Sequence, residues 1–325
     1  MTDFSFRSEL LKKNIASCKN FIEKELTGRN LITVLRDLIF LSVSVKVNSN
    51  EKIHPVIIIN IIKNLIGDNR EKPSKTLLVF CVNYLLQFDL RSNDKKVLKN
   101  AIKNGIGQTA FIGDLEDAYQ ESAWDNAQKA TAIFFLSSDN SRGTFDALAE
   151  IALQDIKKNG LFIFHIMRAY NFQETKDDNW VFTRCLMSYL IGNKLPEPHS
   201  NTKTTPKSIK DKILLNGDIV LFSAMERLWE CDYVRIEGYQ REISYWCSHE
   251  LNNSFDNSKL KSLIWIFKTG KNRFIEHTEN LVQCTNKDDL QIKNSLILIE
   301  SFRALLKKLR VKQLLILKTR FNNLK

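Results

Sequence analysis

A histidine and an arginine lie within one of the most apolar segments of this chain, residues 160–173. His165 and Arg168 are three residues apart, so a helix would place them on one face together with Phe164. A helix that is apolar on all sides is normally buried. Burial of an imidazole and a guanidinium is costly unless each finds a polar partner. We therefore expect both side chains to meet polar groups in the interior, either in a structural network or in a ligand pocket.

These two residue types would support a defined chemistry in a pocket. An imidazole titrates near neutral pH, so His165 could act as a general base or as a hydrogen-bond partner of the substrate. The guanidinium of Arg168 could hold an anionic or oxyanionic group. In the structural alternative, His165 and Arg168 are a satisfied core pair without a ligand.

A second set of candidates forms a stripe on the predicted helix 234–251. Its members recur at helical spacing and combine aromatic and ionisable side chains: Arg235, Tyr239, Glu242, Trp246 and His249. Such a mixture can line a small-molecule pocket. It is also typical of a half-buried helix face that carries an Arg–Glu ion pair.

The acidic segment 114–125 could in principle bind a metal together with His165. Asp114, Asp117, Glu121 and Asp125 share one helical stripe, and inward-facing carboxylates are metal ligands in helical bundles. The opposite face is apolar, which favours a solvated acidic surface. We therefore predict no metal site and leave the cofactor unidentified, but keep Glu121 as a substrate-binding candidate.

Several enzyme classes lack support because their motifs are absent. The chain has no HExxH, Walker loop, GxGxxG before a helix, GxSxG or zinc-ligand spacing, so metalloprotease, serine hydrolase, nucleotide-dependent and common flavin chemistry are disfavoured. Its six cysteines form no CxxC pair. They are therefore expected to be free thiols in a reducing cytoplasm.

The net charge of +11 is concentrated near the C-terminus. Residues 301–325 contain eight basic side chains and no acidic one, so the other 300 residues carry only +3. Leucines alternate with these charges as in a packed amphipathic helix, and cations suit a helix C-terminus. We expect a solvated terminal helix. Its segment Leu305–Lys325 could contact a protein or an acidic partner, whereas nucleic-acid binding is disfavoured because no recognised motif accompanies the charge.

Helical periodicity dominates the chain and predicts an all-α protein, an irregular multi-helix bundle of paired antiparallel helices. The expected helices span residues 4–26, 31–45, 55–66, 74–88, 95–103, 114–136, 145–158, 161–173, 180–191, 218–230, 234–251, 258–284 and 288–318. Residues 192–217 hold three of the five prolines and are expected to form a loop or linker. This segment divides an N-terminal helical part, residues 1–191, from a C-terminal helical part, residues 218–325, packed on the first.

Local signals mark several helix ends. Ser74 is expected to cap a helix, Pro55 suits a first turn, and Asn159-Gly160 is expected to separate two helices. Residues 217–222 are the best strand candidate, yet we expect a helix to start there. The apolar stretches are too short or too interrupted to span a bilayer, which predicts a cytoplasmic protein without a membrane span.

The order of some of these elements resembles the questin oxidase-like family. His54-Pro55 opens a helix near the start, a Phe-His-x-x-Arg-x-Tyr element covers Phe164–Tyr170, and residues 224–229 are similar to the family's Arg-Leu-Tyr segment. The resemblance extends over about two thirds of the chain. It implies a helical, cofactor-poor oxidoreductase; fungal members open aromatic polyketide rings by a Baeyer–Villiger-type oxidation. It also implies His54, His165 and Arg168 as site residues.

Two functions follow from these patterns. The first is an oxidoreductase that acts on a small aromatic or polyketide-like molecule in a helical pocket. Its catalytic candidates are His165, Arg168 and His54, and its substrate-binding candidates are Glu121, Tyr170, Arg235, Tyr239, Glu242, Trp246 and His249. The alternative is a non-catalytic helical scaffold that binds a protein or acidic partner through its basic C-terminal helix.

Overall fold

The computed structural model describes residues 4–48, 51–103, 111–173, 175–250, 260, 273–284 and 288–323. The helices of the N-terminal half are α1 (Phe6–Leu11), α2 (Ile15–Asn20), η1 (Phe21–Glu25, a π-helical turn), α3 (Leu31–Ser44), α4 (Pro55–Ile66), α5 (Lys75–Leu85), α6 (Asp94–Lys103), α7 (Ile112–Gln120), α8 (Trp124–Ser137) and α9 (Gly143–Leu153). Those that follow are α10 (Ile156–Tyr170), η2 (Lys176–Asp178, a 3-10 turn), α11 (Asn179–Leu190), α12 (Pro206–Asn216), α13 (Ile219–Trp229), α14 (Ile236–His249), α15 (Arg273–Val282), α16 (Asp289–Leu306) and α17 (Val311–Asn322).

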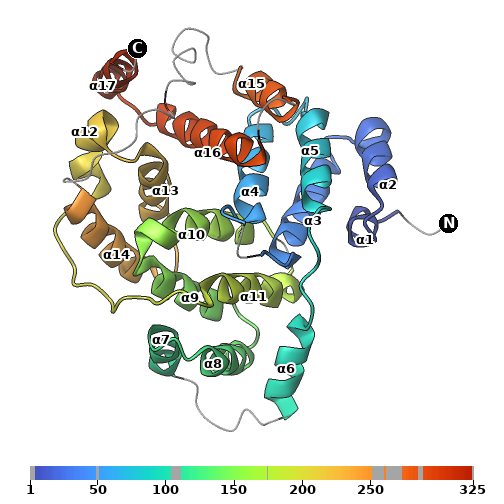
Figure 1. The fold of residues 1–325 in the computed structure, drawn as a ribbon, viewed down its shortest axis with the longest axis vertical. Coiled ribbons are helices and arrows are strands. Elements are labelled where there is room, and N and C mark those ends of the chain that lie inside the picture. Colours follow the sequence, from blue (N-terminus) through green and yellow to red (C-terminus); the bar gives the residue numbers. More distant parts are fainter. Residues whose placement is uncertain are drawn as a thin grey trace.

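The predicted all-α class is confirmed. In the described ranges the β-structure is limited to one isolated antiparallel bridge between Val45 and Leu90. Neighbours in sequence such as α3 and α4, α7 and α8, and α12 and α13 pack against each other. Helices α1 and α2 lie on one side of the molecule and α12 and α17 on the opposite side, with α10 between them (Figure 1). None of the described helices is both long and apolar enough to cross a membrane.

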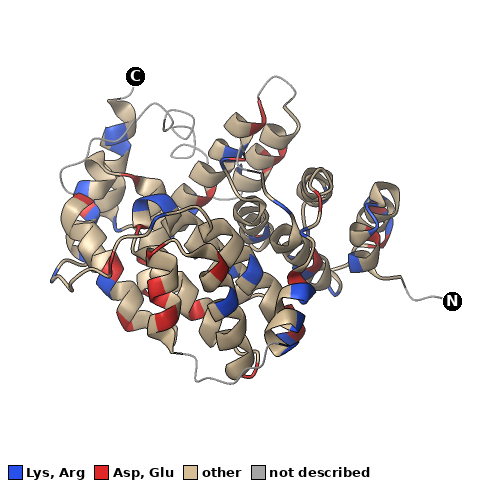
Figure 2. Ribbon diagram, turned by 60° about the horizontal axis from the view of Figure 1, so that its bottom comes forward, with Lys and Arg blue, Asp and Glu red and all other residues tan. Residues whose placement is uncertain are grey.

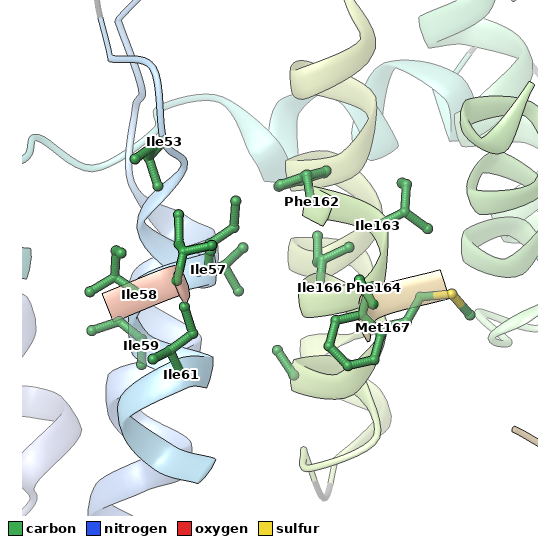
Figure 3. Close-up of a cluster of buried hydrophobic side chains, with 14 of the residues drawn as sticks. Ile53, Ile57, Ile58, Ile59, Ile61, Phe162, Ile163, Phe164, Ile166 and Met167 are labelled. Atoms are coloured by element: carbon green, nitrogen blue, oxygen red, sulfur yellow. The ribbon is translucent and has the colours of Figure 1, made fainter. Parts of the chain in front are cut away.

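Helices α4 and α10 form the centre of the bundle. The sequence of α4 consists mostly of isoleucine and other apolar residues, and its start is fixed by Pro55 in the first turn. Isoleucines of α4 lie opposite Phe162, Phe164 and Ile166 of α10 (Figure 3). Helix α10 also packs on α9 and α13. Nearly all apolar side chains of α4 and α10 are therefore buried.

One hydrophobic cluster joins the two predicted parts of the chain. It contains residues from Phe6 in α1 to Phe321 in α17. The contact between α10 and α13 is close at Gly160, where a Cβ atom would lie 3.1 Å from Leu221 Cδ1 and 3.2 Å from Met225 Cε. The expectation that Asn159-Gly160 ends a helix is therefore wrong. Asp155 caps α10 instead, and Gly160 serves inside the helix as the point of closest approach.

Substitution of Gly160 should disturb this helix contact. A valine would place branched methyl groups against Leu221 and Met225, and overpacking of a dense core typically costs about 1–3 kcal/mol. We expect Gly160→Val to lower the free energy of unfolding by roughly 2 kcal/mol, measured by urea denaturation. Gly113→Val is the matched control, because a Cβ atom at Gly113 meets no described atom within 4 Å. If both variants have the same free energy of unfolding, α13 can shift to accommodate the valine without a loss of stability.

Several helix boundaries differ from the expectation. The expected helix 4–26 is divided into α1, α2 and η1, and the expected helix 114–136 is divided into α7 and α8. Lys13 and Ser122 have positive φ angles at these two breaks, which a continuous helix does not allow.

Other differences lie in the C-terminal part. The expected loop 192–217 contains a helix, α12, which begins at a capping box formed by Thr205 and Ser208. The expected helix 288–318 is interrupted after Leu306, and α17 turns to pack on α12. Most of the expected helix 258–284 lies outside the described residues, and its described part is α15.

Arg320 explains part of this turn. Its guanidinium donates hydrogen bonds to the carbonyl oxygens of Ile213, Leu214 and Gly217 at distances of 2.9–3.3 Å. The last carbonyls of a helix have no partner within the helix, so Arg320 closes the C-terminal end of α12. One charge of the basic C-terminal segment therefore has a structural role.

Candidate functional site

His165 is buried in the centre of α10, as predicted. Its side chain is 1% exposed, and its Nδ1 accepts a hydrogen bond of 2.8 Å from Nδ2 of Asn60 in α4. Burial lowers the pKa of His165 well below its ordinary value, and the positive charges of Arg227, Lys63 and Arg168 lower it further. The imidazole is therefore neutral and carries its proton on Nε2. It lines none of the cavities described below.

Arg168 departs from the expectation of an interior pair. It lies in the last turn of α10, and its side chain is exposed. The end of α10 stays in the core on its other faces, since Met167, Ala169 and Tyr170 are buried, and only the face that carries Arg168 is open to solvent. Among the described residues no ion pair or hydrogen bond holds this guanidinium.

Arg168 instead borders a cavity of about 320 Å³, here called the basic cavity, where four helices meet. Its lining consists of Asn64 from α4, Arg168 from α10, Arg227, Glu230 and Cys231 at the end of α13, and Arg303, Ala304, Lys307 and Lys308 at the end of α16. Five of these side chains are cationic and one is anionic. Because the cavity is concave and its charges come from three rigid helices, a bound anion would meet several donors at once.

Glu300 does not line this cavity but holds two of the arginines that do. Its carboxylate is fully buried and pairs with Arg227 Nη1 at 2.9 Å and with Arg303 Nε at 2.7 Å. Asn64 donates a further hydrogen bond of 2.9 Å. Burial lowers the pKa of Arg227, which Glu300 opposes. The two guanidiniums are thus held in place by one carboxylate, which cannot neutralise both.

Other side chains that line the cavity are also ion-paired. Asp68 accepts hydrogen bonds of 2.7 Å from both Arg303 and Lys307, and Lys308 pairs with Glu230. Three carboxylates therefore pair with four of the five cations, and Arg168 is the one left over in this described set. The cavity keeps an excess of positive charge next to a rigid lining.

Lys63 of α4 carries a buried amine whose charge interacts with that of Arg168. Its side chain is 8% exposed, and its amine lies 4.9 Å from the centre of the Phe172 ring. Burial, together with the charge of Arg168, lowers the pKa of Lys63 to about 7, and the charge of Glu300 opposes this shift. No acceptor among the described residues hydrogen-bonds this amine.

Lys63, Arg227 and Glu300 were not among the predicted site residues, although Arg227 lies in the segment 224–229. The signal that revealed His165 was available for them, since each is a charged residue inside an apolar helical segment. Arg303, Lys307 and Lys308 were noticed, but as parts of a solvated helix.

His54 has a structural role at the start of α4. Its Nδ1 accepts a hydrogen bond of 3.2 Å from the backbone N–H of Val56 and caps α4. Its Nε2 lies 3.4 Å from Sγ of Cys185. Burial lowers the pKa of His54 to about 3 and raises the pKa of Cys185 to about 12. Both shifts oppose the thiolate–imidazolium form that an activated cysteine needs.

The stripe on α14 lies apart from the basic cavity. Glu242 is buried and pairs with His199 Nδ1 at 2.6 Å and with Arg241 Nε at 2.9 Å. Arg235 pairs with Glu150 of α9, and Tyr239 donates a hydrogen bond of 2.9 Å to the carbonyl of Asp146.

Trp246 of the same stripe is buried and His249 is exposed. None of the five stripe residues lines a cavity described here. The stripe thus forms the half-buried, ion-paired face that the sequence left open as the alternative.

The remaining candidates are also separate from His165. Glu121 follows α7 and is exposed. The other acidic residues of this segment are also exposed, namely Asp114 and Asp117 in α7 and Asp125 in α8. This acidic face is therefore solvated. Tyr170 donates a hydrogen bond of 2.6 Å to Asn179 and borders an open hollow of about 400 Å³.

No group of three or more His, Cys, Asp or Glu side chains in the described ranges is arranged to hold a metal ion. All six cysteines are free thiols.

Comparison with known proteins gives no relative. No protein-family model matches the chain, and neither the curated proteins nor the solved structures yield a significant match. The resemblance to the questin oxidase-like family therefore stays a prediction.

Proposed function

We propose that this chain binds a small molecule carrying an oxyanion group, a phosphate, sulfate or carboxylate, in the basic cavity. The observation that carries the proposal is the unequal charge of that cavity, where three carboxylates pair with four of the five cations and Arg168 is left over. Natural proteins avoid uncompensated charge in a confined space unless it has a use.

The shape of the charge distribution favours a small ligand. Basic and acidic residues are interspersed over most helices (Figure 2), whereas nucleic-acid binding needs an extended basic surface. A cavity of about 320 Å³ is within the usual size for a small-molecule site. The acidic partner predicted from the sequence would then be this small anion. Arg303, Lys307 and Lys308 would contact it, rather than the whole segment Leu305–Lys325.

Arg168→Gln tests the site directly, because Arg168 contributes charge without a structural partner in the described chain. We expect sulfate, titrated calorimetrically at low ionic strength, to bind the variant roughly 10- to 100-fold more weakly, as the loss of one charge-assisted hydrogen bond implies. The fold should be unchanged by circular dichroism.

Arg29→Gln is the matched control for this test. Arg29 is also exposed, and it lies just before α3, outside the lining of the basic cavity. It should bind sulfate like the unmodified protein. Equal sulfate affinity of the Arg168 and Arg29 variants would contradict the proposal.

The oxidoreductase hypothesis is a second candidate, favoured by the neutral imidazole of His165, which lies one helical turn from Arg168 on α10. In this case Arg168 would hold the anionic group of an aromatic substrate, and a small movement of α10 would admit it to His165. Metal analysis and an absorbance spectrum of the purified protein identify any cofactor.

The test of this candidate is turnover of phenolic polyketide-like compounds. His165→Gln should abolish turnover and leave sulfate binding intact. Turnover that persists in the variant would exclude His165 as the base.

A further inference from the structure

A second and larger cavity adjoins the basic cavity. It has a volume of about 850 Å³ and lies between α15, the end of α16 and the turn that joins α4 to α5. Helix α15 packs on both α5 and α16 at this end of the bundle (Figure 1). Arg303 and Lys307 line both cavities, so the two spaces meet at these side chains. A ligand that reaches past them would occupy both cavities.

Large apolar side chains distinguish the lining of the larger cavity. Phe274 and Ile275 come from α15, and Leu306 comes from the end of α16. Ile275 and Leu306 are half-buried, so each keeps apolar surface that a ligand could cover. Among its described members, the lining of the basic cavity has no large apolar side chain. Apolar surface and an excess of cations therefore lie in adjoining spaces.

The charges of the larger cavity are closer to balance than those of the basic cavity. Four cationic and three anionic side chains line it. Asp68 is one of the anions, and it already pairs with Arg303 and Lys307. Glu279 is another, and it accepts a hydrogen bond of 2.5 Å from Ser74. A second anionic group would meet these carboxylates, so the larger cavity suits an uncharged part of a ligand.

We propose that the ligand of the basic cavity is an amphiphilic anion, with an oxyanion head at Arg168 and an apolar chain that extends past Arg303 and Lys307 into the larger cavity. The chain would remove the apolar surfaces of Ile275 and Leu306 from water. Because the two cavities share two lining side chains, an elongated molecule fits them better than a compact one. This inference rests on the anion site proposed above and adds the chemical class of its ligand.

Alkyl sulfates of increasing length test the apolar chain while the charged head stays the same. Methyl, butyl and hexyl sulfate are titrated calorimetrically into the full chain, below the concentrations at which they form micelles, with inorganic sulfate as the reference. Burial of each methylene group strengthens binding, so the affinity should rise roughly two- to fourfold per methylene. We expect hexyl sulfate to bind at least about tenfold more tightly than methyl sulfate.

Ile275→Asn should remove most of this dependence on chain length. The variant should bind hexyl sulfate roughly tenfold more weakly than the unmodified protein does. Its affinity for inorganic sulfate should be unchanged, because Ile275 does not line the basic cavity. Val282→Asn is the matched control, since Val282 is half-buried two turns further along α15 and does not line the larger cavity.

Thermal melting and circular dichroism show whether these variants are folded. Ile275→Ala is the milder variant in case asparagine destabilises α15, and it should weaken hexyl sulfate binding in the same direction. Sulfate binding without a dependence on chain length would overturn this inference alone. A dependence that Ile275→Asn and Val282→Asn leave equally intact would place the chain elsewhere and also overturn it. Absence of sulfate binding would remove the anion site itself.

Discussion

Glu300→Gln is expected to lower the free energy of unfolding by roughly 3–5 kcal/mol, the usual cost of removing one partner of a buried ion pair. Glu300 is fully buried and faces Arg227 and Arg303 together. The amide keeps the shape of the side chain but not its charge. Arg227 loses its one ion pair in the described chain, whereas Arg303 keeps Asp68. Urea denaturation at low ionic strength measures the loss.

The same variant should be rescued by anions. Without Glu300 the basic cavity carries more positive charge, so sulfate should bind more tightly and restore part of the lost stability. Glu237→Gln is the control, since Glu237 is exposed on α14 and should change neither stability nor sulfate response. A destabilised Glu300 variant that sulfate does not stabilise would show that Glu300 is structural and that the cavity is not an anion site.

The fold class could be predicted because helical periodicity is a local property of the sequence. Pro55 and Ser74 mark the starts of α4 and α5 as expected, and Asp218 caps α13 where a helix start was predicted rather than a strand. Each of these signals acts over three or four residues.

Boundaries set by tertiary contacts could not be predicted in this way. Asn159-Gly160 has the composition of a helix end, but Gly160 is needed inside α10 because α13 approaches there. The break between α16 and α17 depends on α12, whose end is capped by Arg320 more than 100 residues later. A pattern that covers one turn contains no information about such a partner.

The candidate site could be predicted only in part, again because contacts between distant parts of the chain decide it. The segment around His165 identified the correct helix, and Arg168 does border a cavity. The sequence could not show that the two residues separate at the helix end, one into the core and one to the surface. Nor could it show that Asn64 and Glu300, 236 positions apart, are joined by a hydrogen bond beside the same arginines.

Acid should destabilise this protein through its two buried histidines. His54 and His165 are neutral in the fold because burial lowers both pKa values, that of His54 to about 3. In the unfolded chain both titrate near 6.5. Below that pH the unfolded chain binds more protons than the folded one, so stability is lost as the pH falls. The loss is about 1.4 kcal/mol per pH unit for each histidine, or roughly 5 kcal/mol for both at pH 4.5.

Buried carboxyls act in the opposite direction, because burial raises the pKa values of Asp37, Asp146 and Asp218. The contribution of each histidine is therefore isolated by difference. His165→Gln keeps an acceptor for Asn60 Nδ2, and His54→Asn keeps a capping oxygen for α4. Relative to the unmodified protein, each variant should lose about 1.4 kcal/mol less stability per pH unit between pH 6 and 4. If the unmodified protein and both variants respond to acid with the same slope, the imidazoles must find water or an anion in the folded state. His165 would then be accessible from the basic cavity, as the oxidoreductase hypothesis requires.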